Sequence, residues 1–332
     1  MGTFAQKMNL ANFTCTFGEK YVLLDMFDEV VSPAFTGKHT RTYSDSTYFL
    51  LDVGVFLYDS DEVVVSGRIV KNTTIGREQL YRDGKIVADR QQIESAPTSF
   101  FVLRLSDHKS LYVRENSGAP GIGTFSSTIS AFIKAEYRKW IRIKYDEMKK
   151  KDPGVSWKNV YETFPPPSLE VTPMATESSV TAFLEKFKVI NTVEVRLLET
   201  NHELDNSPIF GNMRRVKSGT GAESVVLRSQ KAGDVGLDKG GVSGLISSPA
   251  EEGNSRIVLR GKDLRGTKLV ADNESLNVAV PIKKLPESVP AATDDLLEKL
   301  LDQIAIGVIK LKDSSVVASA KLKRIISSRT WQ

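Results

Sequence analysis

One stretch of the chain, Ser168–Asn201, constrains the fold most, because it has the residue pattern of a strand, a helix and a second strand. Leu169 and Val171 mark the first strand. Apolar residues at positions i, i+3, i+4 and i+7 predict the helix: Val180, Phe183, Leu184 and Phe187. Alternation with charged residues predicts a second strand with one solvated face: Val193, Val195 and Leu197. Since parallel strands need a crossover connection, we expect a right-handed βαβ unit.

The N-terminal third of the chain has the pattern of antiparallel strands. Ser46–Tyr58 and Glu62–Lys71 are rich in the β-branched and aromatic residues that favour strands. Two hairpins are expected after them, one turning at Asp83-Gly84 and the other at Asp107-His108. The first turn fits type I′, because glycine readily accepts the positive φ that this turn requires. These segments together predict an antiparallel meander.

A long helix is expected after the meander. Thr124 or Ser126 can cap its N-terminus, and the apolar periodicity continues to about Lys150. Asp152-Pro153-Gly154 ends the helix. The spacer Pro165-Pro166-Pro167 is stiff, and we place a domain boundary there.

Three further segments have strand composition: Arg256–Arg260, Lys268–Ala271 and Leu276–Ile282. The order of elements predicts an α+β fold, with an N-terminal antiparallel β meander and a long basic helix. A ferredoxin-like second domain containing the βαβ unit is expected to follow. The predicted domains are residues 1–164 and residues 165–290, and residues 291–332 are expected to form a C-terminal helix and a basic tail.

Composition places the chain among ordinary globular proteins. Its 332 residues are 40% hydrophobic and 26% charged. No apolar run approaches the roughly 18 residues that a membrane span needs, so we expect no membrane partner. Cys15 is the only cysteine, which excludes an internal disulfide and favours a reducing compartment. We therefore expect a cytoplasmic location.

The chain carries no catalytic signature, so no catalytic residue is assigned and no cofactor or metal site is expected. Its 3 histidines are widely separated, and no G-x-S-x-G motif is present. A carboxylate site for magnesium needs no fixed spacing, however. Glu194 and Glu199 lie in one predicted strand that resembles a strand of nucleases. A magnesium-dependent nuclease, with Mg²⁺ as its cofactor, is therefore the alternative to a binding protein.

Positive charge is concentrated in a few elements, although the formal net charge is only +4. The long predicted helix offers four candidate phosphate contacts: Lys134, Arg138, Lys139 and Arg142. Aromatic residues among them suit stacking on unpaired bases: Tyr137, Trp140 and Tyr145. The alternative is an ordinary surface helix in which Trp140 and Ile141 cover the core and the aliphatic stems of the Lys and Arg side chains lie over it.

A second basic element is the predicted hairpin Arg256–Lys268. Arg256 and Arg260 share strand parity, so both are expected on one face, and Lys262 follows in the same hairpin. A β-ribbon with such a face can lie along a phosphate backbone. A solvated hairpin is the alternative.

Three segments together resemble a known family: GRIVKNTTIGREQLYRDGKIVAD, APGIGTFSSTISAFI and EEGNSRIVLRGKDLRGTK. The pattern is similar to that of an uncharacterised family of bacterial proteins of unknown function. That family is associated with mobile elements and anti-phage defence. The resemblance includes no motif of known chemistry, so it implies a cellular context and no site.

We therefore expect a cytoplasmic protein that binds nucleic acid or a nucleoprotein, within a prokaryotic anti-phage defence system. The nuclease described above is one alternative. Another is an interaction module that binds a protein partner or forms a homo-oligomer and does not contact nucleic acid.

Overall fold

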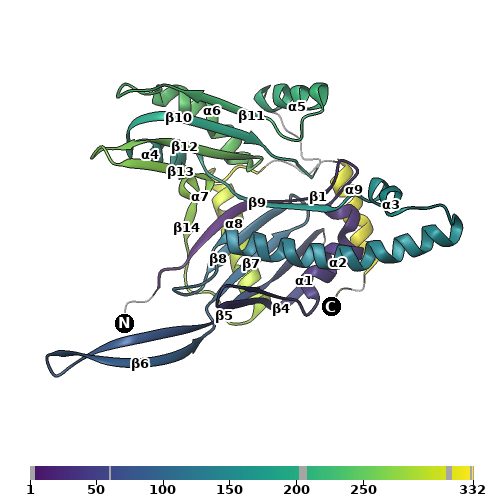
Figure 1. Ribbon diagram of the computed structural model, residues 1–332, viewed down its shortest axis with the longest axis horizontal. Helices are drawn as coiled ribbons and strands as arrows, with labels where there is room; N and C mark the ends of the chain where they lie inside the picture. Colours follow the sequence, from purple (N-terminus) through teal and green to yellow (C-terminus); the bar gives the residue numbers. More distant parts are fainter. Residues whose placement is uncertain (1–3, 60, 202–207, 312–315, 330, 332) are drawn as a thin grey trace.

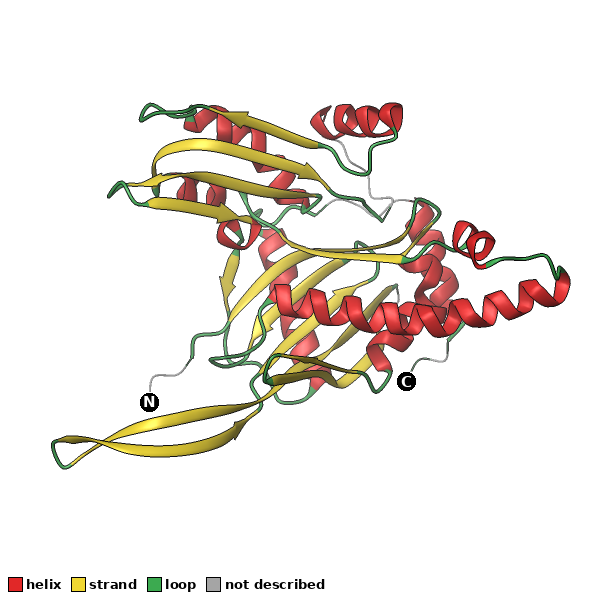
Figure 2. Ribbon diagram, viewed as in Figure 1, coloured by secondary structure: helices red, strands yellow, loops and turns green. Residues whose placement is uncertain are grey.

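The computed structural model describes residues 4–59, 61–201, 208–311, 316–329 and 331. It contains a ten-stranded sheet and a separate four-stranded sheet, with helices packed against both (Figures 1 and 2). The predicted α+β class, with an antiparallel sheet first and a smaller second sheet, is confirmed. No helix among these residues is long and apolar enough to span a membrane.

The large sheet has the strand order β14-β1-β8-β7-β5-β4-β3, while β2 and β9 also pair with β1, and β6 pairs with β5. Its strands are β1 (Lys7–Phe17), β2 (Tyr21–Val22), β3 (Thr40–Tyr43), β4 (Ser46–Tyr58), β5 (Glu62–Arg82), β6 (Lys85–Ser95), β7 (Thr98–Arg104), β8 (Lys109–Arg114), β9 (Pro167–Pro173) and β14 (Ala279–Pro281). Every pairing is antiparallel.

Helices cover both faces of the large sheet, which explains why its central strands are apolar at consecutive positions. In β7, Phe101 packs into a core with Phe13 and Phe125, whereas the adjacent Phe100 and Val102 pack into another. The first core is covered by a 3₁₀ turn (Leu23–Met26), a π-helical turn (Phe27–Val31), α1 (Ser32–Thr36), α2 (Ile122–Lys151), α3 (Trp157–Thr163) and α9 (Val316–Ser327). The second is covered by α8 (Val289–Ala305).

Strand β5 is longer than predicted. It does not stop near Lys71 but runs on to Arg82, 21 residues in all, and its outer part pairs with β6 to form a ribbon that projects from the body (Figure 1). The predicted turn at its tip is confirmed, since Asp83 and Gly84 have φ of 50° and 78°. The segment predicted as a separate hairpin is therefore the outer half of one continuous strand and its partner.

The small sheet has the order β11-β10-β12-β13. Its strands are β10 (Phe187–Leu197), β11 (Val226–Gln230), β12 (Ser255–Asp263) and β13 (Lys268–Asp272). One face packs against α4 (Glu177–Leu184), α6 (Lys239–Glu252) and α7 (Asn273–Leu276). Helix α5 (Pro208–Thr220) packs at the end of β10, where Phe210 and Met213 contact Leu197.

The predicted parallel βαβ unit is wrong, although its strand, helix and strand all exist. Strand β9 pairs antiparallel with β1, from Phe17↔Pro167 to Ala11↔Pro173, whereas β10 pairs with β11 and β12 in the other sheet. Phe187 is the first residue of β10 and not part of the helix. The helix therefore connects the two sheets. The unit could not be predicted correctly because the pairing of β9 with the distant strand β1 leaves no signal in the local sequence.

Residues predicted to lie in the second and third domains contribute to the large sheet and its cores. Strands β9 and β14 both pair with β1, and α8 and α9 pack against the two faces of the large sheet. The small sheet and its helices are thus an insertion between β9 and β14.

Buried amides join the two sheets. Asn12 in β1 accepts a hydrogen bond from Lys109 Nζ at 2.9 Å and donates one to Asn254 Oδ1 at 2.8 Å. Asn201, just after β10, donates to the Phe13 carbonyl at 2.8 Å and accepts from the Cys15 amide at 3.0 Å. These contacts fix the end of β10 and the start of β12 against β1.

Candidate nucleic-acid interface

The small sheet buries one face and leaves the other exposed, as strand alternation requires. Val193 and Val195 of β10 and Ile257 and Leu259 of β12 are at most 1% exposed and pack against the helices. The intervening residues point to the opposite side. Arg256 and Arg260 lie there, as their shared parity predicted, with Lys262 on the same side of β12.

We call this exposed side the open face. The register adds two arginines from neighbouring strands and one lysine to it: Arg196 of β10, Arg228 of β11 and Lys268 of β13. Their side chains were not among the predicted contacts. Arg196 alternates with the buried residues of its strand, so its parity was a usable signal, but the pairing of β10 with β11 was not visible in the sequence.

Like charges face each other directly across strands on the open face. Arg196 is the register partner of Arg256, and Lys262 is the register partner of Lys268. Directly opposed like charges destabilise a sheet. The fold therefore carries a local electrostatic cost that an anion bound on this face would relieve.

Carboxylates neutralise only part of this charge. Glu194, in the middle of β10, lies 3.4 Å from Arg228 and 3.0 Å from Arg260. Arg256 lies 3.4 Å from Glu170. These arginine side chains are still 49–56% exposed, and ion pairs at such exposure contribute little free energy. A phosphate group can therefore replace the carboxylates at small cost.

Lys262 is oriented by a loop residue. It donates a hydrogen bond to Asp234 at 2.7 Å, and this contact lowers the pKa of the Asp234 carboxyl from its usual value. The lysine side chain remains 44% exposed and the aspartate 84% exposed. The pair is thus open to solvent, and the lysine remains accessible to a ligand.

The other positions of the open face are aliphatic, polar or acidic: Val226, Val258, Val270, Thr192, Gln230 and Asp272. The Asp272 carboxylate accepts a hydrogen bond from the Ser275 amide at 3.0 Å and so caps α7. The four strands, all within the described part of the chain, place no aromatic side chain there. The open face therefore suits contact with phosphates and sugars and not base stacking.

The predicted cations of the long helix are all exposed. Helix α2 begins at Ile122, just before the predicted caps Thr124 and Ser126. Lys134, Arg138 and Arg142 are spaced four apart and form one edge of the helix. Lys139 lies beside this edge and pairs with Glu136 at 2.7 Å.

The aromatic residues of α2 are not available for stacking on bases, so that part of the prediction is wrong. Tyr137 is 4% exposed and donates a hydrogen bond to the Phe164 carbonyl at 2.5 Å. Trp140 meets the Phe164 ring edge-on, and Tyr145 stacks on Trp157 at 4.0 Å between ring centroids. These residues fix α3 and the segment after it against the helix. Ile141 lies in the core and Trp140 packs against it, as the alternative of an ordinary surface helix expected.

The carboxylates that suggested a nuclease do not converge. Glu194 contacts Arg228 and Arg260, and Glu199 pairs with Lys217. Among the residues that the structure describes, no group of three or more His, Cys, Asp or Glu side chains has the arrangement of a metal site.

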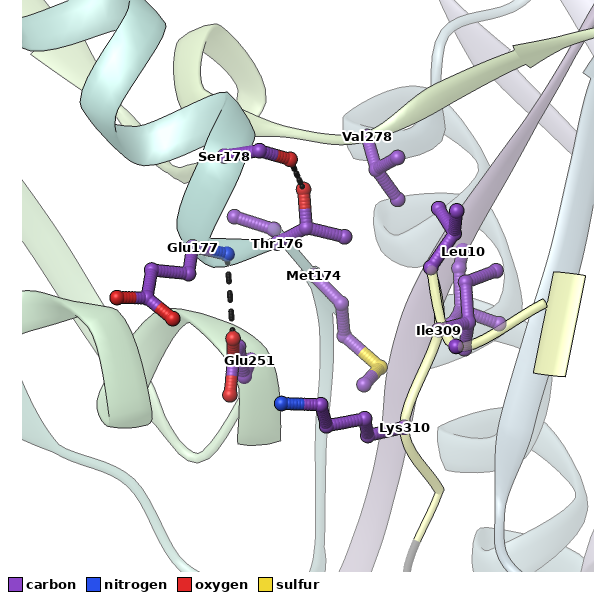
Figure 3. A pocket seen from close by; sticks show the side chains of 12 residues that line it. Leu10, Met174, Thr176, Glu177, Ser178, Glu251, Val278, Ile309 and Lys310 are labelled. Atoms are coloured by element: carbon purple, nitrogen blue, oxygen red, sulfur yellow. Dashed lines mark hydrogen bonds between the residues drawn. The ribbon is translucent and has the colours of Figure 1, made fainter.

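A cavity of about 280 Å³ lies where α4 begins, beside β1, β9 and residues 307–310 (Figure 3). Lys310 extends into it, and Glu251 accepts a hydrogen bond from the Glu177 amide at 3.1 Å. Glu251 thereby supplies the negative charge that the N-terminus of α4 attracts, so the cavity does not offer this position to an anionic ligand.

Comparison with known proteins adds no relative: no protein-family model and no curated protein matches this sequence. The interpretation of the open face therefore depends on its geometry.

Proposed function

We propose that the protein binds nucleic acid by holding its phosphate backbone on the open face of the small sheet. The observation that carries the proposal is that two cross-strand register pairs on this face join like charges, Arg196 with Arg256 and Lys262 with Lys268. Counterions released from a bound phosphate chain provide most of the free energy in such complexes. The exposed edge of α2 is proposed as a second contact region.

A strand without secondary structure is the form of nucleic acid that this surface suits best. A four-stranded antiparallel sheet with helices on one side presents a broad and shallow surface, which can follow a flexible backbone. Binding without aromatic stacking is expected to show little sequence preference.

Charge reversal tests the open face. Arg260→Glu combined with Lys262→Glu is expected to weaken binding of a labelled single-stranded oligonucleotide by at least about tenfold, or ~1.4 kcal/mol, in fluorescence anisotropy. The matched control is Lys186→Glu with Lys239→Glu, which changes the net charge equally on the helical side of the same sheet. Equal losses in both variants would mean that general charge, not the open face, drives binding.

The helix edge is tested separately with Arg138→Glu combined with Arg142→Glu. If α2 is a second contact region, this variant also binds more weakly than the control. Unchanged affinity would remove α2 from the proposal and leave the open face as the contact region.

The same preparations distinguish a binding protein from a magnesium-dependent nuclease. Labelled DNA and RNA are incubated with Mg²⁺ or with EDTA. A protein that only binds nucleic acid leaves the DNA and RNA intact under both conditions. Cleavage that needs Mg²⁺ and persists after repurification would favour the nuclease.

We also propose a cytoplasmic location and a role in prokaryotic anti-phage defence, supported by the single cysteine and by the family resemblance. Expression in a bacterial host is expected to lower phage plating efficiency, and charge reversal on the open face is expected to restore it. Plating that is unaffected by expression would count against this role.

A further inference from the structure

The ribbon formed by β5 and β6 is an isolated two-stranded arm. Strand β5 pairs with β4 up to Thr73 and with β7 up to Val70. Within the described part of the chain, the two arm strands pair only with each other from Thr74 to Glu94. The arm extends beyond the other strands of the large sheet and away from the small sheet (Figure 1). A two-stranded hairpin of this kind is at best marginally stable in water without a packing partner.

One face of the arm carries two exposed apolar patches. Ile75 is paired with Ile93 near the base, and Tyr81 is paired with Ile86 near the tip. Their exposed fractions are 54%, 48%, 70% and 65%. Residues 75 and 81 share strand parity, so both patches lie on the same side, which we call the apolar arm face.

An ion pair separates the two patches. Arg77, which shares the parity of Ile75 and Tyr81, forms a salt bridge with Asp89 across the arm. Along its length the apolar arm face therefore has an apolar patch, an uncharged polar middle made of the Arg77–Asp89 ion pair and the cross-strand pair Gln79↔Ala88, and a second apolar patch. The opposite face is different, since its exposed positions are mostly charged: Glu78, Arg82, Lys85, Arg90 and Glu94.

This pattern is the same when read from either end. A two-fold symmetric interface requires such self-complementarity, because one surface must match itself after rotation. We propose that the apolar arm face is a dimer interface and that its occupant is the same face of a second copy, packed antiparallel. The base patch of one arm then covers the tip patch of the other.

Charge supports a second copy as the occupant. Because Arg77 and Asp89 neutralise each other, two apolar arm faces meet without net repulsion, and Arg77 of one copy comes beside the middle of the other arm. Four large side chains per copy form a small interface, so dissociation in the micromolar range is expected.

Sedimentation velocity across the micromolar range tests the proposal. The wild-type protein is expected to shift from monomer to dimer with concentration. Tyr81→Ser with Ile86→Thr is expected to stay monomeric. The matched control, Leu80→Ser with Val87→Thr, alters the neighbouring cross-strand pair on the opposite face and is expected to dimerise like the wild type. A wild-type protein that stays monomeric, or a dimer that survives the Tyr81 and Ile86 changes, would overturn the proposal.

Spin labels test the antiparallel arrangement. The native Cys15 does not compete for label, since it is fully buried and burial raises its pKa to about 12. With a centre at Glu78, midway between the patches, the backbone separation between copies is ~10 Å at Glu78 and ~35 Å at Asp83, from 3.3 Å per residue and 10 Å between packed sheets. Glu78 lies on the opposite face, so a label there stays outside the interface. Glu78→Cys is thus expected to give a short distance and Asp83→Cys a long one. Short distances at both would contradict antiparallel packing.

Discussion

At the scale of single residues, buried side-chain amides hold the two sheets together, and the sequence does not reveal which asparagines do so. Asn201 was expected only as the end of a strand segment, yet it hydrogen-bonds the backbone of β1 on both sides of Thr14. No local pattern marks such a residue, because its partners lie 186 and 188 positions away in the chain. In contrast, the orientation of Arg256 and Arg260 was predictable, since strand parity is a local property.

Asn201→Ala is expected to destabilise the protein strongly. The change leaves the Cys15 amide and the Phe13 carbonyl buried without these partners, at about 1–3 kcal/mol for each group. Urea unfolding should report a loss on the order of 2–4 kcal/mol. Asn72→Ala, at an exposed position of β5, is the control and should change stability little. Equal stability of the two variants would contradict the assigned role.

Because Tyr112 is buried, the free energy of unfolding is expected to depend on pH in the alkaline range. Burial raises the pKa of its hydroxyl, which donates to the Pro120 carbonyl at 2.7 Å. The unfolded chain therefore ionises first, near pH 10, and stability declines above that pH by up to ~1.4 kcal/mol per pH unit. Tyr112→Phe should make this decline shallower, whereas Tyr81→Phe, at an exposed site, should not. Parallel curves for wild type and Tyr112→Phe would refute this.

At the scale of elements, segments with strong local signals were predicted well. Strand β4 has the predicted bounds, and the Asp83-Gly84 turn has the predicted backbone. The partner of β9 was not predictable, because alternation fixes which residues face the core and not which strand lies alongside. For the same reason the sequence did not show that β5 is one continuous strand, because its outer half has an ordinary strand pattern but extends beyond the body.

The arm is expected to be dispensable for folding. Residues 75–93 can be replaced by Asn-Gly, because Thr74 and Glu94 are register partners and a two-residue type I′ turn can join them. The shortened protein should keep its circular dichroism spectrum and its melting temperature within a few degrees, and should remain monomeric. A large loss of stability would mean that the arm contributes to the cores of the body.

At the scale of the whole molecule, positive charge from separate strands meets only after folding. Arg228 of β11, Arg196 of β10 and Arg256 of β12 lie far apart in sequence but across adjacent strands. A sequence can suggest the cations of one hairpin, as it did for Arg256–Lys268. It cannot supply the register that brings in the remaining arginines, because that register depends on long-range pairing.

The salt dependence of binding tests the central claim most directly. Fluorescence anisotropy with a single-stranded oligonucleotide gives the slope of log affinity against log salt concentration, which falls by about 0.7 for each phosphate contact. Arg260→Ala with Lys262→Ala should reduce the magnitude of the slope by about 1.4, and Lys186→Ala with Lys239→Ala should leave it unchanged. Equal slopes for the wild type and the open-face variant, or no binding by the wild type at low salt, would contradict the proposal that this face holds the phosphate backbone.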